Sequence, residues 1–194
     1  DLPPRLVRSP AGVLHGLGRP NPGLRVVIRD YAPLWAAWSL PVIVNIAGQN
    51  TGEYATIGAT LDGVPGVAGL EADLSCPAEE SDGAPFGYDA ALSWQVIHTL
   101  RQACALPILA KLPLRLPGLA EVAQAVTLAG ADAVTLIAPL PAMSLDVRRG
   151  RVEILGGLSG PALRPVALRC LYEVARALPN TPLVGVGGIS SGED

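Results

Sequence analysis

Short hydrophobic runs alternate along this chain with longer segments of helical periodicity. From residue 40 onward, hydrophobic runs typical of buried strands occupy 41–48, 67–75, 106–114, 131–139 and 182–190. Between them, apolar residues recur at intervals of three and four in segments that include 91–104, 118–130 and 164–178. This alternation predicts strand–helix units whose strands run parallel and are joined by right-handed crossovers.

Polar or conformationally special residues follow one strand after another at its carboxyl end. They are Asn45, Asp73, Lys111, Ile137 with Ala138, and Gly187 with Gly188. Barrel enzymes build their sites at this end of the strands, whereas a doubly wound sheet gathers its ligand groups at one switch point. No GxGxxG fingerprint opens a helix here. We therefore expect an α/β fold, and specifically a (β/α)8 TIM barrel.

The predicted barrel is incomplete. About five strand–helix units are recognisable, whereas a closed barrel of this kind has eight strands. The chain opens on the loop-like "DLPPR" and ends on "GGISSGED", where a helix would begin. We interpret residues 1–194 as a single domain and an internal fragment that lacks the early strands and the last one.

Composition narrows the classes of partner. The chain is 49% hydrophobic and 16% charged, with a formal net charge of −3 and no basic cluster, which argues against nucleic acid and favours a small-molecule ligand. No apolar span reaches the roughly 20 residues of a membrane helix. The cysteines Cys76, Cys104 and Cys170 have no zinc-ligand or disulfide-framework spacing. We expect no metal site, no membrane segment and a cytoplasmic location.

Lys111 is the only lysine among the 14 Lys and Arg residues, and it lies in a hydrophobic run. A cation is costly to bury unless it is paired. Three interpretations are open: a structural ion pair, a Schiff-base nucleophile, or a compact positive charge placed against an electron-rich cofactor.

Several motifs occur together in a familiar order. They are "PPRLVRSPAGVLHGLGRPNPG", "PVIVNIAG", "LEADLSCPAEESDGAPFGYD", "ILAKLP", "AGADAVTLI", "GGLSGPALRPVALRCLYEVARAL" and "GVGGISSGED". The set resembles class 1 dihydroorotate dehydrogenases, closest to the subclass that passes electrons to a separate subunit carrying FAD and an iron–sulfur cluster. The resemblance implies an FMN-binding barrel that oxidises dihydroorotate to orotate in pyrimidine biosynthesis. We also expect a homo-oligomer.

The resemblance assigns a role to individual residues. FMN would be bound by Asn45, Asp73, Lys111, the backbone of Ile137, and Gly160, Gly187 and Gly188. Lys111 would stabilise the anionic reduced flavin. Cys76 in "LSCP" would be the catalytic base, because a modest decrease from the ordinary thiol pKa of about 8.5 lets a thiolate accept a proton near neutral pH. Cys104 and Cys170 are interpreted as buried hydrophobic residues.

The substrate half of the motif set departs from the family. Family members hold orotate with asparagine at four positions, which here are His15, Asp73, Ala78 and Ala138. Aspartate accepts but does not donate hydrogen bonds, and alanine does neither. The cofactor half is therefore predicted to be retained and the substrate half to be altered. The alternatives are a flavoprotein acting on a different small cyclic substrate, a degenerate FMN-binding paralogue, and a Schiff-base lyase that uses Lys111.

Overall fold

The computed structural model describes residues 5–18, 20–77 and 83–194. Five parallel strands form its main sheet in the order β3-β4-β5-β6-β9. Their bounds are β3 (Ile43–Ile46), β4 (Gly69–Asp73), β5 (Ile108–Leu112), β6 (Ala133–Leu136) and β9 (Leu183–Gly185). Each strand lies inside one of the five predicted runs, so the parallel α/β prediction is confirmed. The strands are shorter than the runs because the flanking hydrophobic residues continue into the loops.

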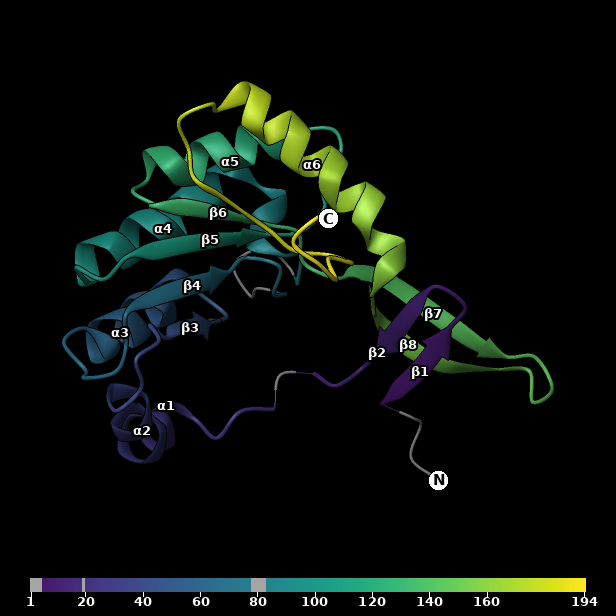
Figure 1. Cartoon of the computed structure of the whole chain (residues 1–194), viewed down its shortest axis with the longest axis horizontal. Helices are drawn as coiled ribbons and strands as arrows, with labels where there is room; N and C mark the ends of the chain where they lie inside the picture. The colour runs from purple at the N-terminus through teal and green to yellow at the C-terminus, as the bar shows by residue number, and fades with distance from the viewer. Residues whose placement is uncertain (1–4, 19, 78–82) are drawn as a thin grey trace.

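Four helices cover one face of this sheet (Figure 1). They are α3 (Thr51–Leu61), α4 (Ala90–Ala103), α5 (Leu119–Leu128) and α6 (Arg164–Ala177). The sequence predicted the last three within one or two residues. The sequence did not single out α3. Its buried positions are Tyr54, Gly58 and Leu61, and the glycine and threonine residues of this segment weaken the helical pattern of hydrophobic residues. Asn50 caps α3 by accepting a hydrogen bond from the Glu53 amide at 2.9 Å.

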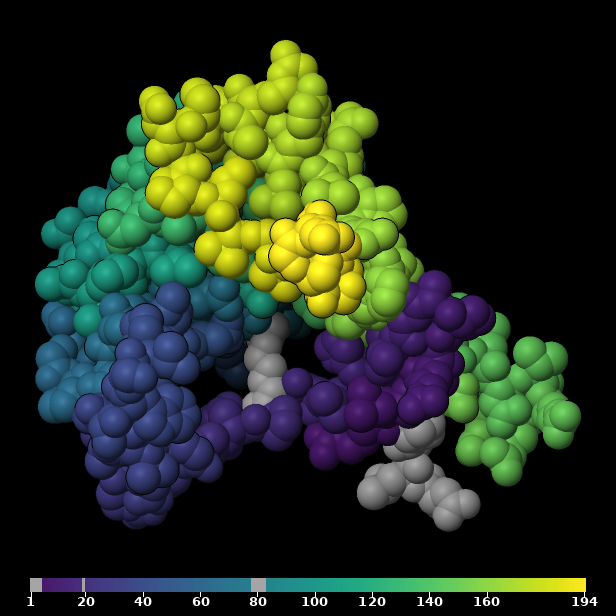
Figure 2. Space-filling model, viewed as in Figure 1, coloured from purple at the N-terminus to yellow at the C-terminus, as the bar shows by residue number. Residues whose placement is uncertain are grey.

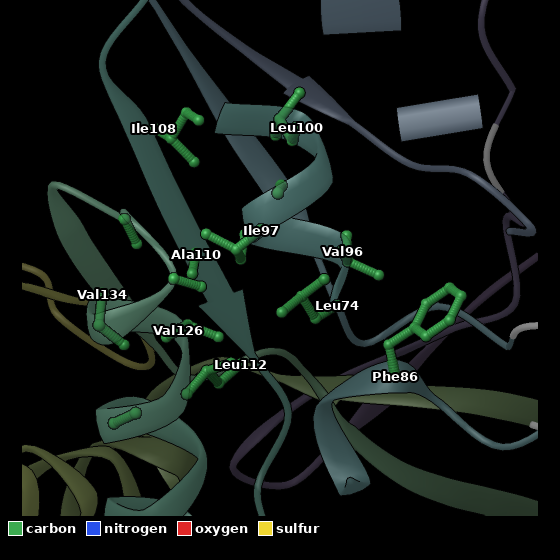
Figure 3. Close-up of a cluster of buried hydrophobic side chains, with 14 of the residues drawn as sticks. Leu74, Phe86, Val96, Ile97, Leu100, Ile108, Ala110, Leu112, Val126 and Val134 are labelled. Atoms are coloured by element: carbon green, nitrogen blue, oxygen red, sulfur yellow. The ribbon is translucent and has the colours of Figure 1, made fainter. Parts of the chain in front are cut away.

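The hydrophobic core lies between the parallel sheet and its helices (Figure 3). Alternate residues of β5, Ile108, Ala110 and Leu112, point toward the helices and are fully buried. Leu100 of α4 and Val126 of α5 pack in the same cluster. Because a strand directs successive side chains to opposite faces, the residues between these core positions face away from the helices.

Replacement of Leu100 by alanine is expected to lower the free energy of unfolding by about 2–5 kcal/mol, because the buried site cannot collapse fully around the lost methyl groups. The matched control is Leu128→Ala, since Leu128 lies on α5 with 74% of its surface exposed whereas Leu100 has 0% exposed. Urea unfolding followed by circular dichroism measures both variants. Equal losses in the two would show that the described core is wrong.

A second, antiparallel sheet adjoins the first (Figure 1). Its order is β1-β2-β8-β7, with bounds β1 (Leu6–Ser9), β2 (Gly12–His15), β7 (Leu140–Asp146) and β8 (Arg151–Ser159). Taken by itself, the stretch "DVRRGRVEIL" at 146–155 predicts only a small hairpin in this region. The observed hairpin is longer, and the N-terminal strands extend it into a sheet. Periodicity could not reveal that pairing because β2 and β8 are far apart in the chain.

Short helical segments fill the remaining connections. They are α1 (Leu24–Val26), the π-helix η1 (Val27–Tyr31), α2 (Ala32–Ala36), and the 3-10 helices η3 (Phe86–Tyr88) and η4 (Pro161–Leu163). None of the described helices combines the length and hydrophobicity needed to span a bilayer. Within the described part of the chain, β3 and β9 each pair on one side only, so the parallel sheet is an incomplete barrel.

Candidate functional site

The inner face of the parallel sheet carries the polar residues of the candidate site. The register pairs Asn45 of β3 with Glu71 of β4, and Asp73 of β4 with Lys111 of β5. Lys111 is in turn paired with Thr135 of β6. Paired residues of neighbouring parallel strands project to the same face, opposite the helices. The sheet therefore gathers on one face residues that are up to 90 positions apart in the sequence.

A cavity of about 940 Å³ lies between these strand ends and the antiparallel sheet. Its walls include His15, Asn45, Glu71, Asp73, Lys111 and Gly157. Figure 2 shows the hollow between the N-terminal segment and the body of the molecule. This volume is within the range of about 300–1,000 Å³ that is usual for sites that bind small molecules and cofactors.

Lys111 forms an ion pair with Glu71 on the cavity wall. Its Nζ lies 3.7 Å from Oε2 of Glu71, and the two side chains are 20% and 17% exposed. The same oxygen accepts a hydrogen bond from Nδ2 of Asn45 at 2.7 Å. The ion pair, one of the three interpretations of Lys111, is thus present. Lys111 nevertheless remains one of the residues that line the cavity, so the ion pair does not prevent it from contacting a ligand there.

Asp73 shapes the loop that follows β4. Its Oδ1 accepts hydrogen bonds from the backbone N–H of Ser75 at 3.0 Å and from the Ser75 hydroxyl at 2.5 Å. Tyr54 donates its hydroxyl to the Asp73 carbonyl at 2.7 Å. This is an Asx-type turn, in which the side chain holds the backbone two residues on. Asp73 therefore fixes the direction in which the chain leaves the strand.

Cys76 lies in this loop, three residues beyond β4. Its side chain is 1% exposed. Ser75 and Pro77, its neighbours on either side, form part of the cavity wall, whereas Cys76 is not among the described residues that line it. The expected substrate residue Ala78 lies outside the described residues. The structure thus brings Cys76 to the margin of the cavity but not onto its wall.

The two remaining substrate positions differ in their surroundings. His15, on β2, lines the cavity, and its Nε2 lies 3.2 Å from the hydroxyl oxygen of Ser159 on β8. Ala138 is 1% exposed, and its N–H donates to the carbonyl of Leu112 at 3.0 Å. Pro139, the next residue, reaches the cavity instead. Of the four expected substrate residues, the described part of the structure therefore places His15 and Asp73 on the cavity wall but not Ala138.

A second cavity of about 390 Å³ adjoins the first, and Lys111 and Pro139 line both. Its wall also includes Ile137, Ser159, Gly160, Gly187 and Gly188. The N–H of Ile137 already donates to the carbonyl of Val186 at 3.1 Å, so its carbonyl is the backbone group that could serve a ligand. The three glycines that the resemblance assigned to FMN binding therefore share one crevice.

Three glycines of this crevice, Gly160, Gly187 and Gly188, have a backbone conformation that favours glycine, and two of them show it most clearly. Gly160 and Gly188 have φ angles of +105° and +70°, which side-chain-bearing residues rarely adopt. A Cβ at Gly188 would lie 2.8 Å from the Gly160 carbonyl oxygen and 2.9 Å from the Arg164 nitrogen. Arg164 begins α6, so the crevice lies beside the N-terminus of a 14-residue helix. Backbone N–H groups at such a position favour an anion.

The two cavities together suit an elongated ligand with an anionic end. Lys111 would lie between its two parts, and the glycine crevice would receive the anion. Thr135, beside Lys111 in the register, is 1% exposed, and its hydroxyl has no hydrogen-bond partner among the described residues. An unpaired buried hydroxyl is uncommon, which points to an additional partner on this face. These residues fit a phosphate-bearing, electron-rich cofactor.

Sequence reasoning missed three residues of the site. Glu71 lies two positions before Asp73 in a strand, so the alternation of side chains could have placed both on one face. Thr135 could be placed beside Lys111 only once the register of β5 and β6 was known, because alternation within one strand does not show which residues of two strands are paired. Ser159 gave no signal, because its neighbour His15 is 144 positions away.

The other two cysteines are removed from this chemistry. Cys104, just after α4, and Cys170, within α6, are both buried. Burial raises the pKa of each thiol, which keeps it protonated near neutral pH. This agrees with their interpretation as small hydrophobic residues. Among the described residues, no group of three or more His, Cys, Asp and Glu side chains is placed to hold a metal ion.

Comparisons with known proteins agree on one family. A family model described as dihydroorotate dehydrogenase matches residues 2–194. The chain is 44% identical over 195 residues to the "Dihydroorotate dehydrogenase B (NAD(+)), catalytic subunit" of Desulforudis audaxviator, covering 99% of this chain and 63% of the relative. Proteins of the same name from Pelobacter propionicus and Geobacillus kaustophilus are 41% and 36% identical over 98% of the chain. The chain spans 64% and 62% of their lengths.

Proposed function

The chain belongs to the dihydroorotate dehydrogenase family, and on this premise we propose that the protein is an FMN-dependent oxidoreductase that oxidises the CH–CH bond of dihydroorotate to orotate in pyrimidine biosynthesis. The observation that carries the proposal is the pair of adjoining cavities that share Lys111. One is large enough for a flavin ring and a small substrate, and the other is a glycine-lined crevice suited to a phosphate.

In the proposed mechanism the chain's residues bind the cofactor and move a proton. Lys111 and Asn45 orient the ring system, and Gly160, Gly187 and Gly188 let the backbone approach the phosphate. The chemistry that FMN would supply, when held by these residues, is the acceptance of a hydride from the substrate. Cys76, as its thiolate, would take the proton from the neighbouring carbon, so that the substrate loses one hydride and one proton and gains a double bond. The loop fixed by Asp73 positions this thiol.

The proposed partners follow from the relatives. Their names describe a catalytic subunit of an NAD(+)-linked enzyme, which implies a companion subunit in those proteins. For this protein we propose an iron–sulfur and FAD electron-transfer subunit as the electron acceptor, together with a homo-oligomeric catalytic core and a cytoplasmic location. Purification of a tagged catalytic chain with its co-expressed partner would test the association.

A second candidate is a flavoprotein of this fold that acts on a different small cyclic substrate. Asp73 favours it, because this carboxylate lies on the wall of the cavity and would repel the carboxylate of dihydroorotate. Ala138 favours it as well, since it offers no side-chain hydrogen bond. Turnover with dihydroorotate separates the two candidates. A protein that binds FMN but oxidises neither dihydroorotate nor another small cyclic compound would be a degenerate paralogue.

Replacement of Lys111 by alanine is expected to weaken flavin binding about 10- to 100-fold, in line with the loss of a hydrogen bond or contact to a charged group worth about 1.5–3 kcal/mol. The protein would be expressed from its complete reading frame, and its flavin would be quantified by visible absorbance and identified after release by chromatography. Arg149→Ala is the control, because Arg149 is an exposed cation on the β7–β8 turn.

Two results would count against this assignment. Wild-type protein without flavin absorbance, even after reconstitution with FMN, would overturn the proposed function. Wild-type flavin content in Lys111→Ala would overturn the role of Lys111 alone. A borohydride-trapped substrate adduct on Lys111 would instead support the Schiff-base lyase.

A further inference from the structure

One carboxylate joins two residues that the family resemblance assigns to cofactor binding. Oε2 of Glu71 accepts the amide N–H of Asn45 at 2.7 Å and lies 3.7 Å from the ammonium nitrogen of Lys111. Glu71 itself has no role in the proposed mechanism. It is nevertheless the residue through which Asn45 and Lys111, on two different strands, are connected.

The strand register produces this arrangement. Asn45 is directly opposite Glu71, whereas Lys111 is opposite Asp73, two residues farther along the same face of β4. Lysine is long enough to reach back diagonally to Glu71. The contact also determines how Asn45 is oriented, because its NH2 group is directed at the carboxylate and its carbonyl oxygen is left to face another group. Glu71 thereby fixes both the ammonium and the amide.

The charge balance of the cavity gives the contact a second consequence. Among the described residues that line the larger cavity, Lys111 is the only Lys or Arg, whereas Glu71 and Asp73 are both acidic. The Glu71 and Lys111 side chains are only 17% and 20% exposed, so water screens the pair incompletely. The positive field that reaches a ligand beside Lys111 therefore depends on whether Glu71 is charged.

We propose that Glu71 is a positioning residue that holds Lys111 and Asn45 in place and compensates the lysine charge, so that it lowers the reduction potential of the bound flavin. This inference rests on the proposed function, because it concerns the cofactor that Lys111 would contact. An uncompensated lysine would stabilise the anionic reduced flavin more strongly. Glu71 limits that stabilisation while it keeps the ammonium and the Asn45 amide oriented.

The test is the reduction potential of the bound flavin, measured by anaerobic titration against reference dyes on the protein expressed from its complete reading frame. Glu71→Gln keeps the side-chain length and an oxygen that can accept from Asn45, but it removes the charge. We expect at least a tenfold shift of the equilibrium toward reduced flavin, which corresponds to a rise of about 30 mV for a two-electron couple. Lys111→Met is expected to shift the potential in the opposite direction.

The double variant makes the test specific for the pair. Removing both charges leaves the pair neutral, as in the wild type, so Glu71→Gln with Lys111→Met is expected to return the potential close to the wild-type value. Glu121→Gln is the matched control, since this glutamate on α5 is 72% exposed and lies outside both cavities. Its potential should equal that of the wild type.

The outcomes separate this inference from the proposed function. A wild-type protein that binds no flavin overturns the proposed function and the inference with it. A flavin-bound wild type whose potential is unchanged or lowered in Glu71→Gln overturns the inference alone. If Glu71→Gln binds its flavin weakly, the ratio of its dissociation constants for oxidised and reduced FMN is measured instead, because this ratio gives the same shift in potential. A ratio changed at least tenfold in favour of reduced FMN supports the inference, and an unchanged ratio overturns it.

Discussion

Replacement of Cys76 by serine is expected to lower the rate of dihydroorotate oxidation near neutral pH by about 10²- to 10⁴-fold, the usual contribution of a general base. A serine hydroxyl loses its proton at far higher pH than a thiol, so little of the basic form is present. The remaining activity should rise with pH, because the deprotonated fraction of the hydroxyl increases. The measurement is the pre-steady-state rate of flavin bleaching on mixing with dihydroorotate, recorded at several pH values.

Cys104→Ala is the control for this experiment, because the Cys104 thiol is buried at the end of α4 and away from the cavity. It should bleach at the wild-type rate. Equal rates for Cys76→Ser and the wild type would exclude Cys76 as the base. The Cys76 side chain is 1% exposed, and the described cavity wall passes through its two neighbours, Ser75 and Pro77.

The second large effect concerns the altered substrate positions. The wild-type protein is expected to oxidise dihydroorotate with kcat/KM below the range of about 10⁴–10⁸ M⁻¹s⁻¹ that is usual for enzymes. Asp73→Asn should raise kcat/KM about 10- to 100-fold. An asparagine can keep the Oδ1 bonds to Ser75, so the turn survives, and it replaces a repelling oxygen by an N–H donor. The gain should appear mainly as a lower KM.

Restoring asparagine at Asp73, Ala78 and Ala138 together should improve kcat/KM more than any single change, because residues around one ligand act as a unit. Among the single changes, Ala138→Asn should give a smaller gain than Asp73→Asn, since Ala138 is buried and its neighbour Pro139 forms the wall. Asp30→Asn, an exposed carboxylate paired with Arg29, is the control. Wild-type kcat/KM within the usual enzyme range would show that the altered positions do not impair substrate binding.

The sequence alone determined the strands of the parallel sheet, three of the four helices that cover it, and the edge of that sheet where the candidate site lies. The runs around β3 to β6 and β9, and the helices α4 to α6, were recognisable because the periods of about 2 and 3.6 residues are properties of a single segment. Parallel strands bring their carboxyl ends to one edge, so Asn45, Asp73 and Lys111 could be grouped without coordinates. Glycines at the crevice were recognisable through the family motifs and not through periodicity.

Only the tertiary structure decided which side chains touch. The sequence could not pair Glu71 with Lys111, because that contact depends on the register of two strands and on a diagonal reach between them. The sequence also could not show that Cys76 lies beside the cavity wall without forming part of it. Nor could it show that His15 lies next to Ser159, which is 144 positions away in the chain. Such contacts arise from the pairing and register of strands that are far apart in the chain, and local patterns of hydrophobicity carry no information about that pairing.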